Sequence, residues 1–219
     1  MVERTIRLLT FNIQHARRPD GVVDVDLLAE VCAAFDADVL ALQEVDDATK
    51  RSGGRNQAAV VAERCGMSWV FGEAIPRYGN ALLARQPVTD VEVLALPHSP
   101  EREPRSAIVA RVGGLSVAAT HLGLHGDARP QLPLVVGALC ERPGPHVLLG
   151  DLNLERADVE LDVAPLVLTA DAGPTFPSRR PRRRIDHVAT SRDVAVSGVA
   201  VLPEPPVSDH RPLLVELSP

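Results

Sequence analysis

The chain is dominated by short apolar runs, several of them apolar on both alternating faces, and this pattern constrains its fold more than any other feature. A strand with two apolar faces belongs to a sheet that is covered on both sides. Turn residues separate ten such runs, at residues 4–13, 37–45, 68–74, 79–87, 90–97, 106–113, 115–122, 146–153, 184–191 and 211–217. We therefore predict strands along the whole chain, in sheets buried on both faces.

Helical periodicity is confined to three segments, residues 24–37, 53–66 and 127–142. The first can be capped by Asp24 or Asp26, the second ends at Gly66, and the third keeps its prolines in its first turns. Many strands and few helices predict an α/β fold in which two packed sheets are flanked by helices. Since no long linker or repeat interrupts the 219 residues, we expect one domain over residues 1–219.

Composition narrows the partners that the chain can have. A net charge of -6 and only 3% aromatic residues count against extensive contact with nucleic acid, which needs positive charge and stacking surfaces. Lys50 is the only lysine, so contacts to anions must come largely from arginine. Cys32, Cys65 and Cys140 lack CxxC spacing, which favours core thiols in a reducing compartment.

The sequence also lacks signals for a membrane. Its first residues have no apolar signal-peptide core, and no apolar run approaches the roughly 18 residues of a membrane span. We expect a cytoplasmic protein with no membrane partner, and the sequence does not set its oligomeric state.

Four predicted strands close on a polar side chain that shares a face with the apolar residues before it. These closing residues are Asn12, Glu44, His121 and Asp151, with Asn153 two positions further on. Because side chains alternate along a strand, each polar group extends an inward-facing row. Polar groups beside a core are costly unless they are satisfied. These endings therefore predict a shared site, together with Asp186 and the neighbours Asp209 and His210.

Convergence of these strands would crowd four carboxylates, those of Glu44, Asp151, Asp186 and Asp209, into a small volume. They cannot all ionise at neutral pH without compensation, and a divalent cation supplies it. The candidate ligands are carboxylate and amide oxygens with no paired cysteine. This donor set favours Mg²⁺ or Mn²⁺ over Zn²⁺.

At these residues the sequence resembles the endonuclease/exonuclease/phosphatase superfamily, whose motifs occur in family order from residue 10 to residue 212. The motifs are TFNIQ with Asn12, LQEV with Glu44, YGNALL with Asn80, PRSA with Arg105, THL with His121, GDLN with Asp151 and Asn153, RRIDHV with Asp186, and SDHRP with Asp209 and His210. The ordered set is specific to the family but not to a substrate. The resemblance implies a four-layer α/β/β/α sandwich of the DNase I-like kind and metal-dependent hydrolysis of phosphoester bonds.

The resemblance also implies a role for each matched residue. Metal binding is implied for Glu44, Asn12 and Asp209. Contacts to the substrate phosphate are implied for Asn153, His121, Asn80 and Arg105. Considered alone, Asn80 serves equally well in a turn and Arg105 in a surface ion pair.

Proton transfer is implied for Asp151 and His210, around the attacking water, with Asp186 orienting His210. These roles agree with the chemistry of the side chains. An imidazole near its unperturbed pKa of about 6.5 exchanges protons at neutral pH, and a carboxylate behind it fixes its tautomer. The acid and the imidazole of the SDHRP motif would then lie together because one helps to hold the metal and the other handles a proton.

Substrate choice is left open by these motifs. Overall acidity and the short chain favour a phosphodiesterase or phosphatase that acts on a small or single phosphoester. The alternative is an endonuclease or exonuclease on DNA or RNA, which would use the run RRPRRR at residues 179–184; that run is either a solvated loop or steers an anionic substrate. A non-catalytic binding module is a second alternative, and it predicts the loss of a metal or proton residue, none of which is missing.

The remaining histidines are expected to be structural: His15, His98, His125, His146 and His187. His187 follows Asp186 in a predicted strand and should therefore point to the opposite face. His15 and His125 lie close in sequence to the motifs and are the two that would be near a substrate.

Overall fold

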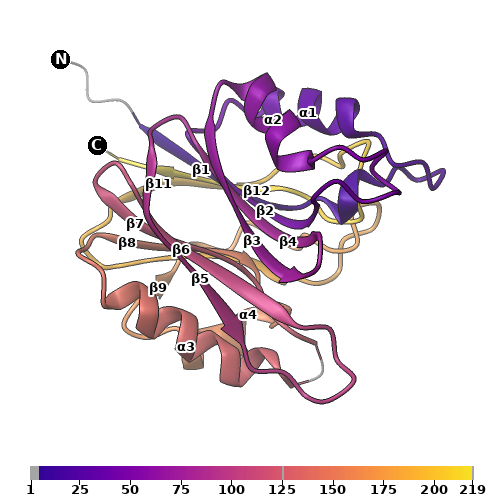
Figure 1. Ribbon diagram of the computed structural model, residues 1–219. Coiled ribbons are helices and arrows are strands. Elements are labelled where there is room, and N and C mark those ends of the chain that lie inside the picture. Colours follow the sequence, from indigo (N-terminus) through magenta and orange to yellow (C-terminus); the bar gives the residue numbers. More distant parts are fainter. Residues whose placement is uncertain (1–4, 125, 219) are drawn as a thin grey trace.

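The computed structural model describes residues 5–124 and 126–218 and contains two mixed six-stranded sheets that pack face to face (Figure 1). The first sheet has the strand order β11-β12-β1-β2-β4-β3, with β1 at Ile6–Asn12, β2 at Val39–Asp46, β3 at Ser68–Ile75, β4 at Tyr78–Ala84, β11 at Val196–Val201 and β12 at Leu213–Leu217. The second has the order β5-β6-β7-β8-β10-β9, with β5 at Val88–Leu96, β6 at Arg105–Val112, β7 at Leu115–His121, β8 at His146–Asp151, β9 at Val167–Leu168 and β10 at Asp186–Thr190.

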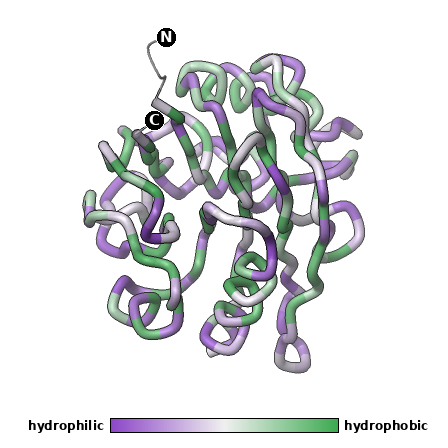
Figure 2. Tube along the Cα trace, turned by 90° about the vertical axis from the view of Figure 1, so that its left-hand side faces the viewer, coloured by the Kyte–Doolittle hydropathy of each residue, from purple (hydrophilic) through white to green (hydrophobic). Residues whose placement is uncertain are grey.

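Helices cover the outer face of each sheet, as Figure 1 shows above and below the strands. They are α1 at Val25–Ala34, α2 at Gln57–Cys65, α3 at Ala128–Cys140 and α4 at Arg156–Asp162. Side chains of α1 and α2 share one apolar core with the first sheet, and those of α3 and α4 share another with the second. A third core lies between the sheets, and hydrophobic residues recur along both the strands and the helices (Figure 2). The predicted four-layer α/β/β/α sandwich is confirmed.

Strand register brings the predicted polar endings to one end of the sandwich. β1 and β2 are parallel, with Asn12 opposite Gln43, and β7 and β8 are parallel, with His121 opposite Asp151. β10 runs antiparallel to β8, so its first residue, Asp186, also lies opposite Asp151. Each sheet therefore contributes polar side chains at this end.

All ten predicted strands and all three predicted helices are present. Asp24 caps α1 by accepting a hydrogen bond from the Leu27 backbone N–H at 3.0 Å. Four elements have no sequence signal: a 3-10 helix spans only Gln14–Ala16, β9 has only two residues, α4 buries a single side chain, and β11 is mostly exposed. Burial of apolar residues provides the period on which such predictions depend, so elements without it are missed.

Two further expectations concerned the burial of the cysteine thiols and the lack of a membrane-spanning segment. Cys32, on the buried face of α1, lies in the core, whereas Cys65 and Cys140 are half-buried, and all three are free thiols. No helix in the described part of the chain is long and apolar enough to cross a membrane.

Gly66→Ala is expected to lower the free energy of unfolding by about 1–2 kcal/mol, the cost of a left-handed backbone for an L-residue. Gly66 ends α2 with a φ of 65°, and an added Cβ meets no atom within 4 Å, so the backbone alone carries the effect. Gly137→Ala, inside α3 and equally unobstructed, should instead stabilise the protein by about 0.5–1 kcal/mol. Urea denaturation of both variants checks this, and changes of the same sign would contradict it.

Candidate active site

Asp151 is the centre of a hydrogen-bonded network that joins the two sheets. Its Oδ2 accepts a hydrogen bond of 3.0 Å from Asn12 Nδ2, which lies on β1 of the first sheet. Its Oδ1 accepts from the Asn153 backbone N–H at 3.1 Å. The same Asn12 nitrogen donates to Glu44 Oε1, also at 3.0 Å. One amide therefore holds two carboxylates, one from each sheet, close to each other.

Glu44 reaches this network through a break in its strand. Strict alternation placed Glu44 on a row with Leu40 and Leu42, but those leucines pack in the core beneath α1 and α2, away from the other sheet. The predicted row is therefore wrong. The β2–β4 register shifts between Leu42 and Val45, and Glu44 has a φ of 58°. Such a bulge re-aims a side chain, and here it turns the Glu44 carboxylate toward Asn12.

His210 lies between two carboxylates of the second sheet. Its Nδ1 is 2.9 Å from Asp186 Oδ2, and its Nε2 is 3.7 Å from Asp151 Oδ2. The His210 backbone N–H donates to Ser208 Oγ at 3.1 Å, and the Phe176 ring packs on the imidazole with centroids 4.8 Å apart. The orientation of His210 is thus fixed from three sides.

These contacts shift the pKa values of both partners. Burial raises the pKa of Asp151 to about 7; the charge of Asp186 adds to this, while that of His210 opposes it. Burial alone would lower the pKa of His210, but the carboxylates of Asp186 and Asp151 outweigh it and raise the pKa to about 10. The arrangement favours a charged imidazolium between two acids, one of which changes its protonation near neutral pH.

His121 and Asn153 form the other side of the network. Asn153 Nδ2 lies 3.1 Å from His121 Nε2 and donates to the Leu122 carbonyl at 2.9 Å. His121 Nε2 is also 3.5 Å from Asp151 Oδ2. Burial, followed by the charges of Arg105 and His210, holds the pKa of His121 well below its usual value, so its imidazole is neutral.

Three predicted site residues lie outside the network. Asp209 lines a groove beside His210, and Ser178 donates its backbone N–H to the Asp209 carbonyl. Asn80 is buried between the sheets, where its Nδ2 donates to the Ser106 carbonyl at 2.9 Å and so ties β4 to β6. Arg105, at the start of β6, forms an ion pair with Glu103, and its charge reaches His121.

The histidines that were expected to be structural divide into two groups. His187 points to the opposite face from Asp186 as predicted, with Nε2 2.9 Å from the Leu154 carbonyl. His98 and His146 also contact backbone carbonyls, and His125 lies outside the described residues. His15 differs, because its Nδ1 is buried without a hydrogen-bond partner and lies 4.0 Å from Glu44 Oε2.

Backbone strain gathers around this network. Of the eleven described residues other than glycine with positive φ, six adjoin it: Gln14, His15, Ala16, Glu44, Asn153 and Ser208. Conformations of this kind cost of order 1–3 kcal/mol each and cluster at functional sites, where surrounding contacts hold them. Such contacts are present, since Gln57 Nε2 donates to the His15 carbonyl at 2.7 Å. The positive φ values are therefore concentrated at the end of the sandwich that carries Asp151.

Two positions at this end of the sandwich could hold a metal ion, one at Asp151, Asp186 and His210 and the other at Glu44. Asp151, Asp186 and His210 each offer a ligand atom within 4.8 Å of the others. A histidine must be neutral to bind a metal, whereas the two acids favour protonated His210. Glu44 is better suited, because its carboxylate is partly exposed beside a cavity of about 570 Å³. Asn12 presents its amide nitrogen to Glu44, so ligation through its oxygen requires the amide to turn over.

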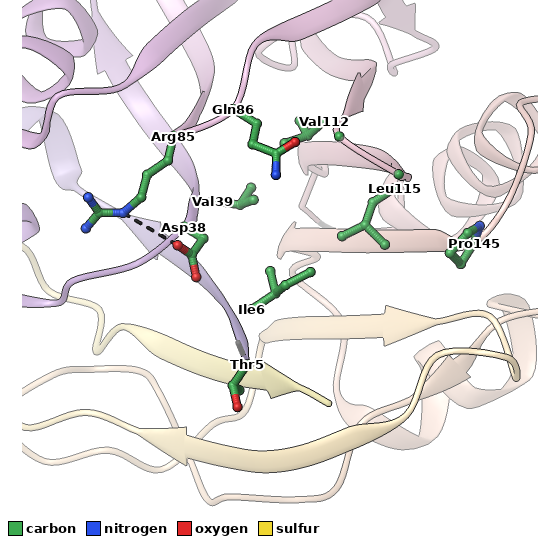
Figure 3. A pocket seen from close by; sticks show the side chains of 11 residues that line it. Thr5, Ile6, Asp38, Val39, Arg85, Gln86, Val112, Leu115 and Pro145 are labelled. Atoms are coloured by element: carbon green, nitrogen blue, oxygen red, sulfur yellow. Dashed lines mark ion pairs between the residues drawn. The ribbon is translucent and has the colours of Figure 1, made fainter. Parts of the chain in front are cut away.

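A different cavity, of about 560 Å³, lies at the other end of the sandwich (Figure 3). Its walls are mainly apolar, with Ile6, Val39, Val112 and Leu115 among the lining side chains, and its charged pair is Asp38 and Arg85. No cluster of acids and histidines that could hold a metal lies there among the described residues. Among the described residues, the one such cluster lies at the opposite end of the sandwich, at Asp151.

Three residues at this end of the sandwich were not among the predicted site residues: Ser208, Phe176 and Tyr78. Ser208 Oγ donates to the Asn12 carbonyl at 2.5 Å and accepts from the His210 backbone, so it joins two motifs that lie far apart in the chain. Phe176 lies in a segment without periodicity, and Tyr78 lies beside Glu44, in the wall of the 570 Å³ cavity. Burial, then the charge of Glu44, raises the pKa of Tyr78. Ser208 and Tyr78 are the first residues of the SDHRP and YGNALL motifs, so the sequence contained a pointer to both, whereas Phe176 lies in no motif.

The layered fold and this network define the class of protein. Two mixed sheets with helices outside, joined at one end by acids and histidines, form a DNase I-like sandwich. The model of the Endonuclease/Exonuclease/phosphatase family matches residues 9–210, and the chain belongs to this family. The family comprises hydrolytic enzymes, phosphoesterases and nucleases that depend on divalent metals. None of the curated proteins matches the chain.

Solved structures show the same fold. An endonuclease/exonuclease/phosphatase from Beutenbergia cavernae is 27% identical with a TM-score of 0.78, over 98% of this chain and 71% of that one. D. rerio TDP2 in complex with single-strand DNA product is 16% identical with a TM-score of 0.77, over 99% and 100% of the two chains. The mannosyl-6-phosphatase Bt3783 of Bacteroides thetaiotaomicron is 19% identical with a TM-score of 0.77, over 97% and 99%.

Proposed function

We propose that this chain is a Mg²⁺- or Mn²⁺-dependent hydrolase of phosphoester bonds. The observation that carries the proposal is the continuous path of contacts from Glu44 through Asn12 and Asp151 to His210 and Asp186. It supplies a carboxylate suited to a hard cation, an acid that titrates near neutral pH and an oriented imidazolium. Together these are the groups that attack of water on phosphorus requires.

Each residue has a distinct part in this reaction. Asp151 accepts the proton of the attacking water, because its pKa lies near neutral pH. His210, held positive by Asp186, donates a hydrogen bond and offsets negative charge that develops on the phosphoryl oxygens. His121 and Asn153 stand on the other side of Asp151 and position the phosphate.

The divalent cation would be held by Glu44, with Asp209 and the Asn12 oxygen as additional ligands. When bound, a cation of this kind polarises a phosphoryl oxygen and neutralises charge on it. Asn80 and Arg105 remain proposed contacts of the substrate phosphate. Asn80 already donates to the Ser106 carbonyl between the sheets, and Arg105 is buried and paired with Glu103, so we expect both to contribute less than His121 and Asn153.

A small or single phosphoester is the substrate we propose. The net charge of -6 and the 3% aromatic content give little surface for a long nucleic acid. A nuclease is the second candidate, favoured by the arginines that line the groove beside Asp209. The likeness to TDP2 bound to single-strand DNA product and to a mannosyl-6-phosphatase is compatible with either substrate class.

Hydrolysis of a substrate panel tests this function. We expect turnover of at least one of bis(p-nitrophenyl) phosphate, phosphomonoesters, single-strand DNA and nicked duplex with Mg²⁺ or Mn²⁺. We expect EDTA to lower that rate by at least about tenfold, because the cation contributes several kcal/mol to transition-state stabilisation. Unchanged rates in EDTA would contradict the metal dependence, and absence of turnover across the panel would favour a binding module. Strong cleavage of duplex at moderate salt would favour the nuclease.

The Glu44→Gln variant tests whether Glu44 binds the metal ion, and Glu63→Gln serves as its control. Calorimetry with Mn²⁺ should show binding weakened by more than about tenfold in Glu44→Gln. Glu63→Gln, an exposed residue of α2, should leave Mn²⁺ binding unchanged. Equal Mn²⁺ affinity of Glu44→Gln and the unmodified protein would move the metal site away from Glu44.

A further inference from the structure

A groove of about 750 Å³ opens beside Asp209, and its walls carry an excess of positive charge. Four arginines line it, against two acids: Arg17, Arg18, Arg179 and Arg180 against Glu204 and Asp209. The chain as a whole is acidic, so this excess is local. Cavities of roughly 300–1,000 Å³ are the usual size for small-molecule sites.

Two of the four guanidinium groups have no acid to neutralise them. Arg18 pairs with Asp20 at 2.9 Å, and Arg179 lies 3.5 Å from Glu204. Arg17 and Arg180 are exposed, and within the described part of the chain their side chains make no hydrogen bond or ion pair. An arginine in this state presents a planar fork of donors that matches the oxygens of a phosphate.

The backbone that carries these two arginines is fixed relative to the active site. Ser208 donates its backbone N–H to the Arg17 carbonyl at 2.8 Å. Ser178 donates its backbone N–H to the Asp209 carbonyl at 2.6 Å and its Oγ to the Ser208 carbonyl at 3.2 Å. Both segments are therefore tied to the loop that also positions His210. A ligand group held in the groove would therefore have a fixed position relative to His210.

We propose that the groove binds a second phosphate of the substrate, through Arg17 and Arg180. This inference rests on the proposed function and narrows it to phosphoesters that carry at least two phosphate groups. Such compounds include sugar bisphosphates and short oligonucleotides with a terminal phosphate. Binding energy from the remote phosphate would orient the ester at Asp151, which is how non-reacting parts of a substrate raise the rate.

Two ligand pairs that differ by one phosphate test the proposal. The pairs are fructose 6-phosphate with fructose 1,6-bisphosphate, and the thymidine dinucleotide TpT with its 5′-phosphorylated form pTpT. Calorimetry on the Asp151→Asn protein with Mg²⁺ should show, in at least one pair, about tenfold or tighter binding of the two-phosphate member. In the variant that combines Arg17→Ala and Arg180→Ala, this ratio should fall to near one. The pair that shows the effect identifies the source of the second phosphate.

Arg182→Ala is the matched control, because Arg182 belongs to the same exposed run but does not line the groove. It should keep the ratio of the unmodified groove. Equal affinity within both pairs, or a preference that survives removal of Arg17 and Arg180, would overturn the proposal. Hydrolysis of bis(p-nitrophenyl) phosphate by the unmodified enzyme tests the proposed function separately. Hydrolysis without a phosphate preference rejects the groove alone, and absence of all hydrolysis rejects the function.

Discussion

Asp151→Asn is expected to lower kcat for phosphoester hydrolysis by about 10²–10⁴-fold, the contribution of a positioned acid–base group. The amide has the same shape as the carboxyl group and can still accept a hydrogen bond from Asn12 or from the Asn153 backbone. It cannot accept a proton from water. Steady-state kinetics at saturating Mg²⁺ measure the loss, and an exposed residue beyond the end of β10 gives a matched control, Asp193→Asn.

The same substitution should not weaken the fold. The pKa of Asp151 in the folded protein is about 7, above the ordinary value of 3.8, so folding disfavours the charged form. The contribution of Asp151 to stability is therefore lost as the pH rises from about 4 through 7. Asparagine has no charged form, so at pH 8 Asp151→Asn should resist urea at least as well as the unmodified protein without metal. A normal kcat would remove Asp151 from the proposed role, and a variant that unfolds more easily at pH 8 would contradict the stability argument.

Strand alternation was enough to place three of the predicted site residues at this end of the sandwich. Asn12, His121 and Asp151 end strands whose apolar side chains on that face fill the core between the sheets. A period of two that holds to the last residue of a strand places that residue by geometry alone. The structure also shows which strands pair with each other, and the alternation of side chains along one strand cannot predict this. It is the register that sets His121 and Asp186 on either side of Asp151.

Glu44 shows where this reasoning ends. Both strand alternation and the family resemblance placed Glu44 near the site. The alternation argument was wrong, because Leu40 and Leu42, which it put on the same face as Glu44, face α1 and α2. A bulge adds one residue and so reverses the parity of all that follows. None of the residue types in LQEV predicts a bulge. Its cause lies in the pairing of β2 with β4, which is a property of the whole sheet.

The contacts that loop residues make with the site could not be predicted, for a related reason. Ser208 and Phe176 contact Asn12 and His210 across long separations in the chain, and neither follows a period. The arginine run at residues 179–184 was visible in the sequence, but the sequence did not show which of its arginines pair with an acid. Arg183 pairs with Glu155 and Arg184 with Asp171, whereas Arg180 faces the groove. Only the folded loop separates the arginines that pair with an acid from those, such as Arg180, that do not.

Asp186→Asn is expected to lower kcat by about 10²–10⁴-fold and to change the pH dependence of the reaction as well. Asp186 supplies the largest contribution that raises the pKa of His210, and its Oδ2 lies 2.9 Å from His210 Nδ1. An asparagine oxygen can keep that hydrogen bond but not the charge. If protonated His210 is the active form, the rate falls as the pH rises through its pKa. The alkaline limb of kcat/KM should therefore move to lower pH in Asp186→Asn. A purely structural role for Asp186 would lower the rate without moving that limb.

The stability of the metal-free protein gives an independent measurement of the same charge. The folded pKa of His210, about 10, lies above its ordinary value of 6.5, so the bound proton stabilises the fold. This contribution is complete below about pH 6.5 and is lost as the pH rises through 10. Urea denaturation in EDTA between pH 6 and 10 should show a decline in the unmodified protein that is shallower in Asp186→Asn. Equal slopes would mean that Asp186 does not hold the proton on His210, and the imidazolium would lose its place in the proposed reaction.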